Sequence, residues 1–133
     1  MIDFACYIRE LTDYLFDFYG VDSNLISFKM DVEGIPLDID VAIPCGLIIN
    51  EIVTNSLKHA FPDERKGQIY IKFHSDNNNT VLTVWDDGIG FKEEINIEKA
   101  ETSGLRLVNK LVKQLDGKIE VNTLKGTEFK IIF

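Results

Sequence analysis

The segment from Asn50 to His59 carries residue types that can bind a charged ligand. It holds a carboxylate, carboxamides, an ammonium group and an imidazole. At about 100° per residue, its polar side chains fall on one side of a helix whose other side is apolar. Glu51 can accept a proton, the Asn55 oxygen can coordinate Mg²⁺, and Lys58 can neutralise phosphate. Taken alone, an ordinary exposed helix face is the alternative interpretation.

A second segment places acidic residues and glycines directly after a strand pattern. Residues 80–85 alternate as a strand does, and Asp86-Asp87-Gly88-Ile89-Gly90 follows. Gly88 and Gly90 allow the backbone to approach a ligand closely. The Asp86 carboxylate, at the mouth of the strand, can accept a hydrogen bond from an exocyclic amino group such as that of adenine. A hairpin turn is the alternative, because Asp-Gly often forms one, but no matching strand follows at once.

Two more glycine sites lie downstream. Ser103 is a candidate N-cap, and Gly104 opens the first turn of a helix predicted over 105–115. The free N–H groups and the positive dipole end of such a helix start favour an anion. Gly126 and Thr127 lie at the turn between the last two predicted strands, where a simple hairpin role is the alternative.

Together these motifs resemble the ATP-binding domain of two-component sensor histidine kinases, which belongs to the GHKL superfamily with the gyrase, Hsp90 and MutL ATPases. The resemblance covers about residues 36–133. It runs through Asn-Glu-(x)3-Asn-(x)2-Lys-His, Asp-Asp-Gly-Ile-Gly, Ser-Gly-Leu and Gly-Thr, in that order. Segments 44–51 and 58–62 are similar to the kinase subfamily with a short ATP lid. Thr102 departs from the usual Gly-x-Gly, and no phenylalanine-centred lid motif lies between Gly90 and Thr102.

The resemblance implies roles for the matching residues. Glu51 would assist proton removal from the phosphoacceptor, Asn55 would bind Mg²⁺, and Asp86 would read adenine. Lys58 and His59 would lie near the phosphates. The full ATP-binding set implied in this way is Asn55, Lys58, His59, Asp86, Gly88, Gly90, Ser103, Gly104, Leu105 and Thr127.

The implied function is transfer of the γ-phosphoryl group of ATP to a histidine in signal transduction, with ATP and Mg²⁺ as cofactors and a response regulator receiver domain as partner. The histidines of the chain are His59, within the predicted site, and His74, within a predicted strand. We therefore expect the acceptor histidine upstream, in a longer sensor kinase. Two alternatives remain open: an anti-sigma-factor-type serine kinase, and a non-catalytic nucleotide-binding or dimerisation module.

The N-terminal residues show a separate apolar pattern. Its members are spaced alternately three and four residues apart, which indicates an a/d helical seam: Met1, Phe4, Ile8, Leu11, Leu15 and Phe18. We interpret residues 1–20 as the end of a dimerisation or linker helix and residues 21–133 as the ATP-binding catalytic domain. A homodimer formed through this helix is then expected in the full-length protein. A helix that packs on its own domain is the alternative.

The composition fits a small domain with a core. The chain has 133 residues, 45% of them apolar, and a net charge of −8. That charge argues against nucleic acid partners and against direct membrane contact by this segment. The two cysteines, Cys6 and Cys45, lie in apolar helical contexts, so we expect buried thiols and a cytoplasmic location. The sequence has neither a signal peptide pattern nor an apolar run long enough to span a membrane.

The predicted element order defines the fold class. A helix and a strand over about 25–32 precede a loop and the Asn/Glu helix. Two strands, a lid, the glycine-started helix and strands over 118–122 and 127–133 follow. This order predicts an α+β fold, a two-layer α/β sandwich with a mixed, mostly antiparallel sheet backed by helices. The family resemblance implies the Bergerat-type ATP-binding version of it.

Overall fold

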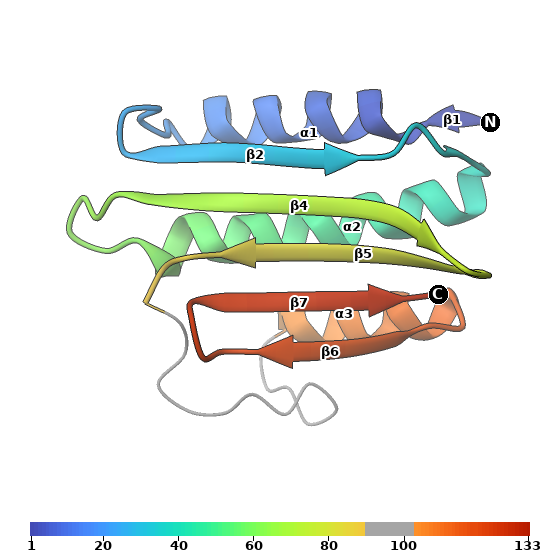
Figure 1. Ribbon diagram of the computed structural model, residues 1–133. Helices are drawn as coiled ribbons and strands as arrows, with labels where there is room; N and C mark the ends of the chain where they lie inside the picture. Colours follow the sequence, from blue (N-terminus) through green and yellow to red (C-terminus); the bar gives the residue numbers. More distant parts are fainter. Residues whose placement is uncertain (90–102) are drawn as a thin grey trace.

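The computed structural model describes residues 1–89 and 103–133. Helices α1 (Phe4–Phe18), α2 (Ile39–Asn55) and α3 (Ser103–Gln114) all cover the same face of a single large sheet (Figure 1). α1 lies behind β2, α2 behind the middle of the sheet and α3 behind its other edge. This arrangement confirms the predicted two-layer sandwich.

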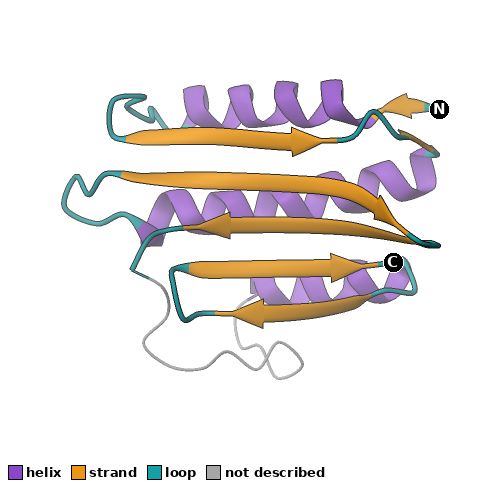
Figure 2. Cartoon of the chain, in the orientation of Figure 1, coloured by secondary structure: helices purple, strands orange, loops and turns teal. Residues whose placement is uncertain are grey.

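The sheet has five strands in the order β2-β4-β5-β7-β6. Figure 2 shows them as one continuous layer. Their bounds are Ile26–Val32 for β2, Gly67–Asp76 for β4, Asn79–Asp86 for β5, Lys118–Asn122 for β6 and Thr127–Ile132 for β7. β2 and β4 run parallel, and every other neighbouring pair is antiparallel. The mixed, mostly antiparallel sheet is therefore as predicted.

Alternation along the strands buries one face of the sheet under the helices. In β4, Ile69, Ile71 and Phe73 are fully buried, while Lys72, between the last two of them, is exposed. The same period of two is what identified these strands in the sequence. The core therefore fills the space between the sheet and the helical layer.

α1 contributes to this core. Phe4 and Ile8 are completely buried, and the ring of Phe4 lies 4.7 Å from that of Phe73. The ends of the predicted seam, Met1 and Phe18, are instead 85% and 66% exposed. The middle of the seam thus packs within the domain, and the dimerisation role of residues 1–20 remains a prediction.

Two local features differ from the sequence analysis. β1 (Ile2–Asp3) pairs antiparallel with β3 (Pro36–Leu37), a segment predicted as loop. A two-residue strand is too short to show periodicity. Cys6 is exposed, which makes the prediction of a buried thiol wrong there, because its side chain projects from the solvent side of α1. Cys45 is buried as predicted, and that burial raises the pKa of its thiol to about 12.

None of the helices in the described part of the chain is both long enough and apolar enough to cross a membrane.

Candidate functional site

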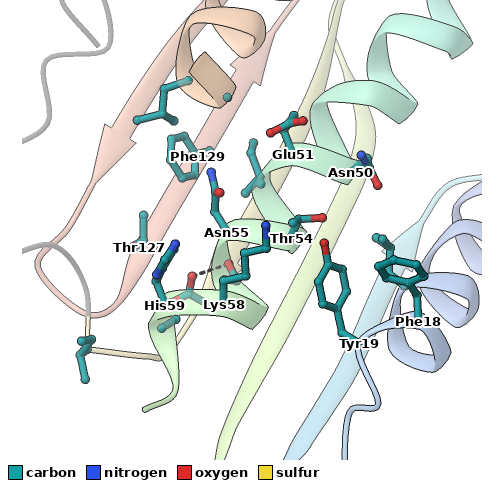
Figure 3. A pocket seen from close by; sticks show the side chains of 18 of the residues that line it. Phe18, Tyr19, Asn50, Glu51, Thr54, Asn55, Lys58, His59, Thr127 and Phe129 are labelled. Carbon is teal, nitrogen blue, oxygen red and sulfur yellow. Dashed lines mark hydrogen bonds between the residues drawn. The ribbon is translucent and has the colours of Figure 1, made fainter. Parts of the chain in front are cut away.

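A cavity of about 730 Å³ opens between the helical layer and the ends of β5 and β7. Figure 3 shows that it runs from Thr127 and His59, past Asn55 and Lys58, to Tyr19 on the far side. The predicted site residues that line it are Glu51, Asn55, Lys58, His59, Asp86, Gly104, Leu105 and Thr127. Residues far apart in the sequence are thus brought to one cavity.

The inner end of the cavity is built around Asp86. This residue ends β5 and pairs in register with Thr127, the first residue of β7. Each of the two is only 4% exposed. The Ser56 hydroxyl donates a hydrogen bond to Asp86 Oδ2 at 2.7 Å, and the Gly88 amide donates one to Oδ1 at 3.0 Å (Figure 3 draws the first as a dashed line).

Burial raises the pKa of Asp86 above its ordinary value. Loss of solvation is the largest cause, and the hydrogen bonds from Ser56, Gly88 and Thr127 oppose it. The nearby charge of Asp87 raises the pKa a little further. A carboxylate that is buried yet partly satisfied has remaining capacity to accept a hydrogen bond from a ligand amino group.

The neighbouring Asp87 has a structural role instead. Its Oδ1 accepts a hydrogen bond of 2.7 Å from the amide of Gln68, and its own amide donates to the Gln68 carbonyl. The Arg65 guanidinium donates to the Asp87 carbonyl at 3.0 Å. These contacts bind the loop after β5 to the start of β4, so the two adjacent aspartates are not equivalent.

Gly88 makes this loop possible. A Cβ at Gly88 would collide with the backbone oxygen and Cβ of Ala60. One residue later, the Ile89 amide donates to the Ala60 carbonyl at 3.0 Å. The close approach at Gly88 is thus to the end of the site helix, and the approach of this backbone to a ligand stays a prediction.

That helix ends in an unusual way. α2 continues directly into η1 (Ser56–Ala60), a π-helical turn. Such turns carry one extra residue per turn and are frequent at functional sites. Within η1, Ser56 is buried and bonds Asp86, whereas Lys58 and His59 are exposed at the cavity.

The start of α3 faces the other predicted groups of α2. A Cβ built on Gly104 would lie 2.7 Å from Glu51 Oε2 and 3.8 Å from Asn55 Nδ2. The N-terminal end of α3 therefore lies beside both side chains. Gly104 gives this approach the space it needs.

Three predicted site residues are not seen to line the cavity in the described structure: Gly88, Gly90 and Ser103. Gly88 lies in the loop beside the cavity rather than in its lining. Ser103 is the first residue of α3, and its side chain falls outside the described part of the structure. Gly90 and the lid segment up to Thr102 also lie outside the described residues.

The cavity also has a wall that the sequence analysis missed. Tyr14, Phe18 and Tyr19, at the C-terminal end of α1, line it. Tyr14 and Phe18 are four residues apart and stack with ring centroids 5.9 Å apart. Tyr14 is not part of the apolar seam, so a second aromatic residue one helical turn from Phe18 was the signal in the sequence that could have indicated this wall.

The donor set fits a metal ion that arrives with a nucleotide. Within residues 1–89 and 103–133, no group of three or more His, Cys, Asp or Glu side chains could hold a metal ion. Mg²⁺ commonly takes one or two protein oxygens and completes its shell with water and phosphate. The Asn55 carboxamide, beside the start of α3, fits that arrangement.

Comparisons with known proteins show what this chain is similar to. Residues 40–133 match the family described as histidine kinase-, DNA gyrase B-, and HSP90-like ATPase. Sensor histidine kinase ComP of Bacillus subtilis is 34% identical over 94 residues, which are 71% of this chain and 12% of ComP. Sensor histidine kinase YdfH, also of Bacillus subtilis, is 36% identical over 127 residues, 93% of this chain and 29% of YdfH.

Solved structures show the same fold. The histidine kinase domain of a blue-light-activated histidine kinase from Erythrobacter litoralis superposes with a TM-score of 0.89 at 24% identity, covering 100% of this chain and 65% of that one. The chain spans only 12% to 36% of the length of the curated relatives ComP, YdfH and blue-light-activated histidine kinase 2 of Erythrobacter litoralis. The chain belongs to the family of histidine kinase-, DNA gyrase B- and HSP90-like ATPases, and it has the sequence and fold of the ATP-binding catalytic domain of sensor histidine kinases.

Proposed function

We propose that this chain binds Mg²⁺-ATP and serves a longer sensor histidine kinase as its catalytic domain. The observation that supports this most strongly is the buried Asp86 carboxylate at the inner end of the cavity, held by Ser56 and Gly88 with acceptor capacity to spare. The adenine amino group is the donor that matches it. Thr127, opposite Asp86 in the sheet, is proposed as the second residue near adenine.

The phosphates are proposed to lie along α2 and the start of α3. Lys58 and His59 would face them from η1, and the amides at the start of α3, from Gly104 onward, would meet them at the positive end of the helix. Asn55 would contribute one oxygen to the metal shell. When bound, Mg²⁺ would neutralise charge on the phosphate oxygens.

Glu51 is proposed to take the proton from the attacking histidine. Its carboxylate lies at the start of α3, on the same helix face as Asn55. A proton acceptor must be within hydrogen-bond reach of the nucleophile. The acceptor histidine is proposed to lie upstream in the parent protein, because His59 is in the cavity itself and His74 is in β4.

The relatives are named sensor histidine kinases. On that basis we propose a response regulator receiver domain as the downstream partner, a homodimeric parent protein and a cytoplasmic location for this domain.

Calorimetric titration with a non-hydrolysable ATP analogue, with and without Mg²⁺, tests the proposal. Saturable, Mg²⁺-strengthened binding that Asp86→Asn greatly weakens is the expected result. A well-folded chain that does not bind would contradict it. In the parent protein, Glu51→Gln should leave nucleotide binding intact and abolish phosphorylation of the histidine, and an unchanged phosphorylation rate would remove Glu51 from its role.

A further inference from the structure

Lys58 and Tyr19 meet across the cavity although they belong to different elements. The Lys58 ammonium lies over the Tyr19 ring, 5.8 Å from its centroid. Figure 3 shows the Lys58 side chain extended beside α2, with Tyr19 facing it from the end of α1. Within residues 1–89 and 103–133, no carboxylate forms an ion pair with Lys58, so the ring is the partner that the structure gives its charge.

The Tyr19 ring is supported by its backbone position, by a neighbouring ring and by the core. Tyr19 is the C-cap residue of α1, and its amide donates to the Leu15 carbonyl at 3.0 Å. The Phe18 ring packs edge-on against it with centroids 5.0 Å apart. Tyr19 is also half-buried against the core. A ring supported in this way can fix a flexible partner.

The electrostatics of this corner favour a cation. The C-terminal end of a helix carries partial negative charge, and α1 has no basic residue in its last turn to balance it. Asp17, in that same turn, adds a full negative charge. Lys58 of η1 supplies positive charge to the corner that α1 leaves uncompensated.

We propose that Tyr19 is a positioning residue that holds the Lys58 ammonium in the cavity before a nucleotide arrives. An ammonium group over a ring face keeps N–H donors free for other acceptors, since it has three. Restricting this long side chain in advance lowers the entropy cost of binding phosphate. This role rests on the nucleotide binding proposed above. It means that the end of α1 helps to form the phosphate-binding end of the site.

The test compares nucleotide affinity in matched variants of this chain by calorimetry with a Mg²⁺–ATP analogue. Tyr19→Leu should weaken binding roughly two- to fivefold, the range expected for a cation–π contact at an accessible site. Tyr19→Phe keeps the ring face and should retain the wild-type affinity. Phe16→Leu is the control, because Phe16 sits near the same helix end but packs on Phe28 rather than in the cavity.

A double-mutant cycle with Lys58→Met separates positioning from general packing. If Tyr19 acts through the lysine, Tyr19→Leu should have no further effect once Lys58 is gone. An equal loss in both backgrounds would overturn the proposal, as would an unchanged affinity in Tyr19→Leu. Thermal unfolding of each variant shows whether the fold is retained.

Proton NMR tests the contact without any nucleotide. The ring should shift the Lys58 ε-methylene protons upfield in the wild type and in Tyr19→Phe, and this shift should vanish in Tyr19→Leu. If the wild-type chain binds no nucleotide but shows the shift, the proposed function fails and the ring–lysine contact stands. If the shift is missing in the wild type, the positioning role is overturned whatever the affinity.

Discussion

The two ends of the cavity are built in different ways. At the inner end, Asp86 and Thr127 are fixed by strands and Ser56 by η1, and each of these three residues is at most 5% exposed. At the outer end, Lys58 and His59 are exposed side chains at the end of a helix. The sheet thus supplies a rigid, desolvated hydrogen-bonding group, and the helix supplies solvent-exposed charges.

The difference matches the chemistry of the two halves of a nucleotide. An adenine amino group is neutral and directional, so a fixed acceptor in a dry pocket recognises it well. Phosphates are strongly charged and symmetric, and accessible cations, amides and a metal ion suit them. If the contrast is correct, substitutions at the inner end should change nucleotide affinity or the free energy of unfolding more than substitutions at the outer end.

Asp86→Asn should have the largest effect on binding. The ionised acceptor is lost, which removes a charge-assisted hydrogen bond worth about 1.5–3 kcal/mol and weakens nucleotide affinity by about 10- to 100-fold. The unfolding midpoint should stay the same or rise, because a buried charge is replaced by a neutral amide that can still bond Ser56 and Gly88. Calorimetry measures the affinity, and thermal unfolding of the same sample measures the midpoint. A midpoint that falls along with affinity would mean that the fold, not recognition, was damaged.

The pH dependence of Asp86 should follow from its burial. The pKa of Asp86 in the folded protein lies above the ordinary value of 3.8, so the folded protein holds this proton more tightly than the unfolded chain does. The stability gained in this way is fully present below pH 3.8 and is lost as pH rises through the folded pKa. The stability advantage of Asp86→Asn over wild type should therefore grow with rising pH across that window. Wild-type nucleotide affinity should also rise with pH across this window and weaken as pH falls through it, because the ionised carboxylate is the acceptor. Urea unfolding and calorimetry over a pH series measure both, and parallel curves for the two proteins would contradict the prediction.

Gly88→Ala tests the rigidity of the inner end. The new methyl group would collide with the backbone oxygen of Ala60, which cannot rotate away as a side chain can. Overpacking of this kind costs about 1–3 kcal/mol. Urea denaturation should show that loss in the free energy of unfolding, whereas a neutral result would show that the loop after β5 adapts.

Lys58→Met should act only through the phosphates. Removal of one accessible cation should weaken ATP binding by about 1 kcal/mol, roughly fivefold, and this loss should shrink as salt concentration rises. Binding of adenosine, which lacks phosphates, should not change. Titration of both ligands at two salt concentrations makes the comparison, and an equal loss for adenosine would place Lys58 at the wrong end of the cavity.

Much of the inner end could be predicted because it depends on local pattern. The alternation before Asp86 and the Asp-Gly after it mark a strand that ends in a close turn, and the structure has both. The Ser56 partner could not be foreseen, since it is thirty residues away in the sequence and meets Asp86 only once α2 and η1 pack on the sheet. Helical periodicity places a residue on a buried face but does not say which strand lies opposite it.

The contribution of α1 was harder still to predict. Its seam predicts a helix correctly, but the spacing of apolar residues does not say whether the partner is the same domain or another chain. Burial of Phe4 and Ile8 against the sheet depends on long-range packing, and the position of Tyr19 over the cavity depends on where α1 ends. Element types could therefore be predicted from local pattern, whereas contacts between elements could not.

Gly104→Ala should have the smallest effect and completes the comparison with Gly88. Its methyl group would lie 2.7 Å from Glu51 Oε2, the far end of a flexible side chain that can move aside. Alanine also favours helix over glycine, so the free energy of unfolding should change by less than about 0.5 kcal/mol. Adenosine affinity should be unchanged and Mg²⁺-ATP affinity should shift by no more than about twofold, about 0.4 kcal/mol. Gly88→Ala measured in parallel is the matched control. If Gly104→Ala proves as costly as Gly88→Ala, the outer end is as rigid as the inner one and the contrast between them fails.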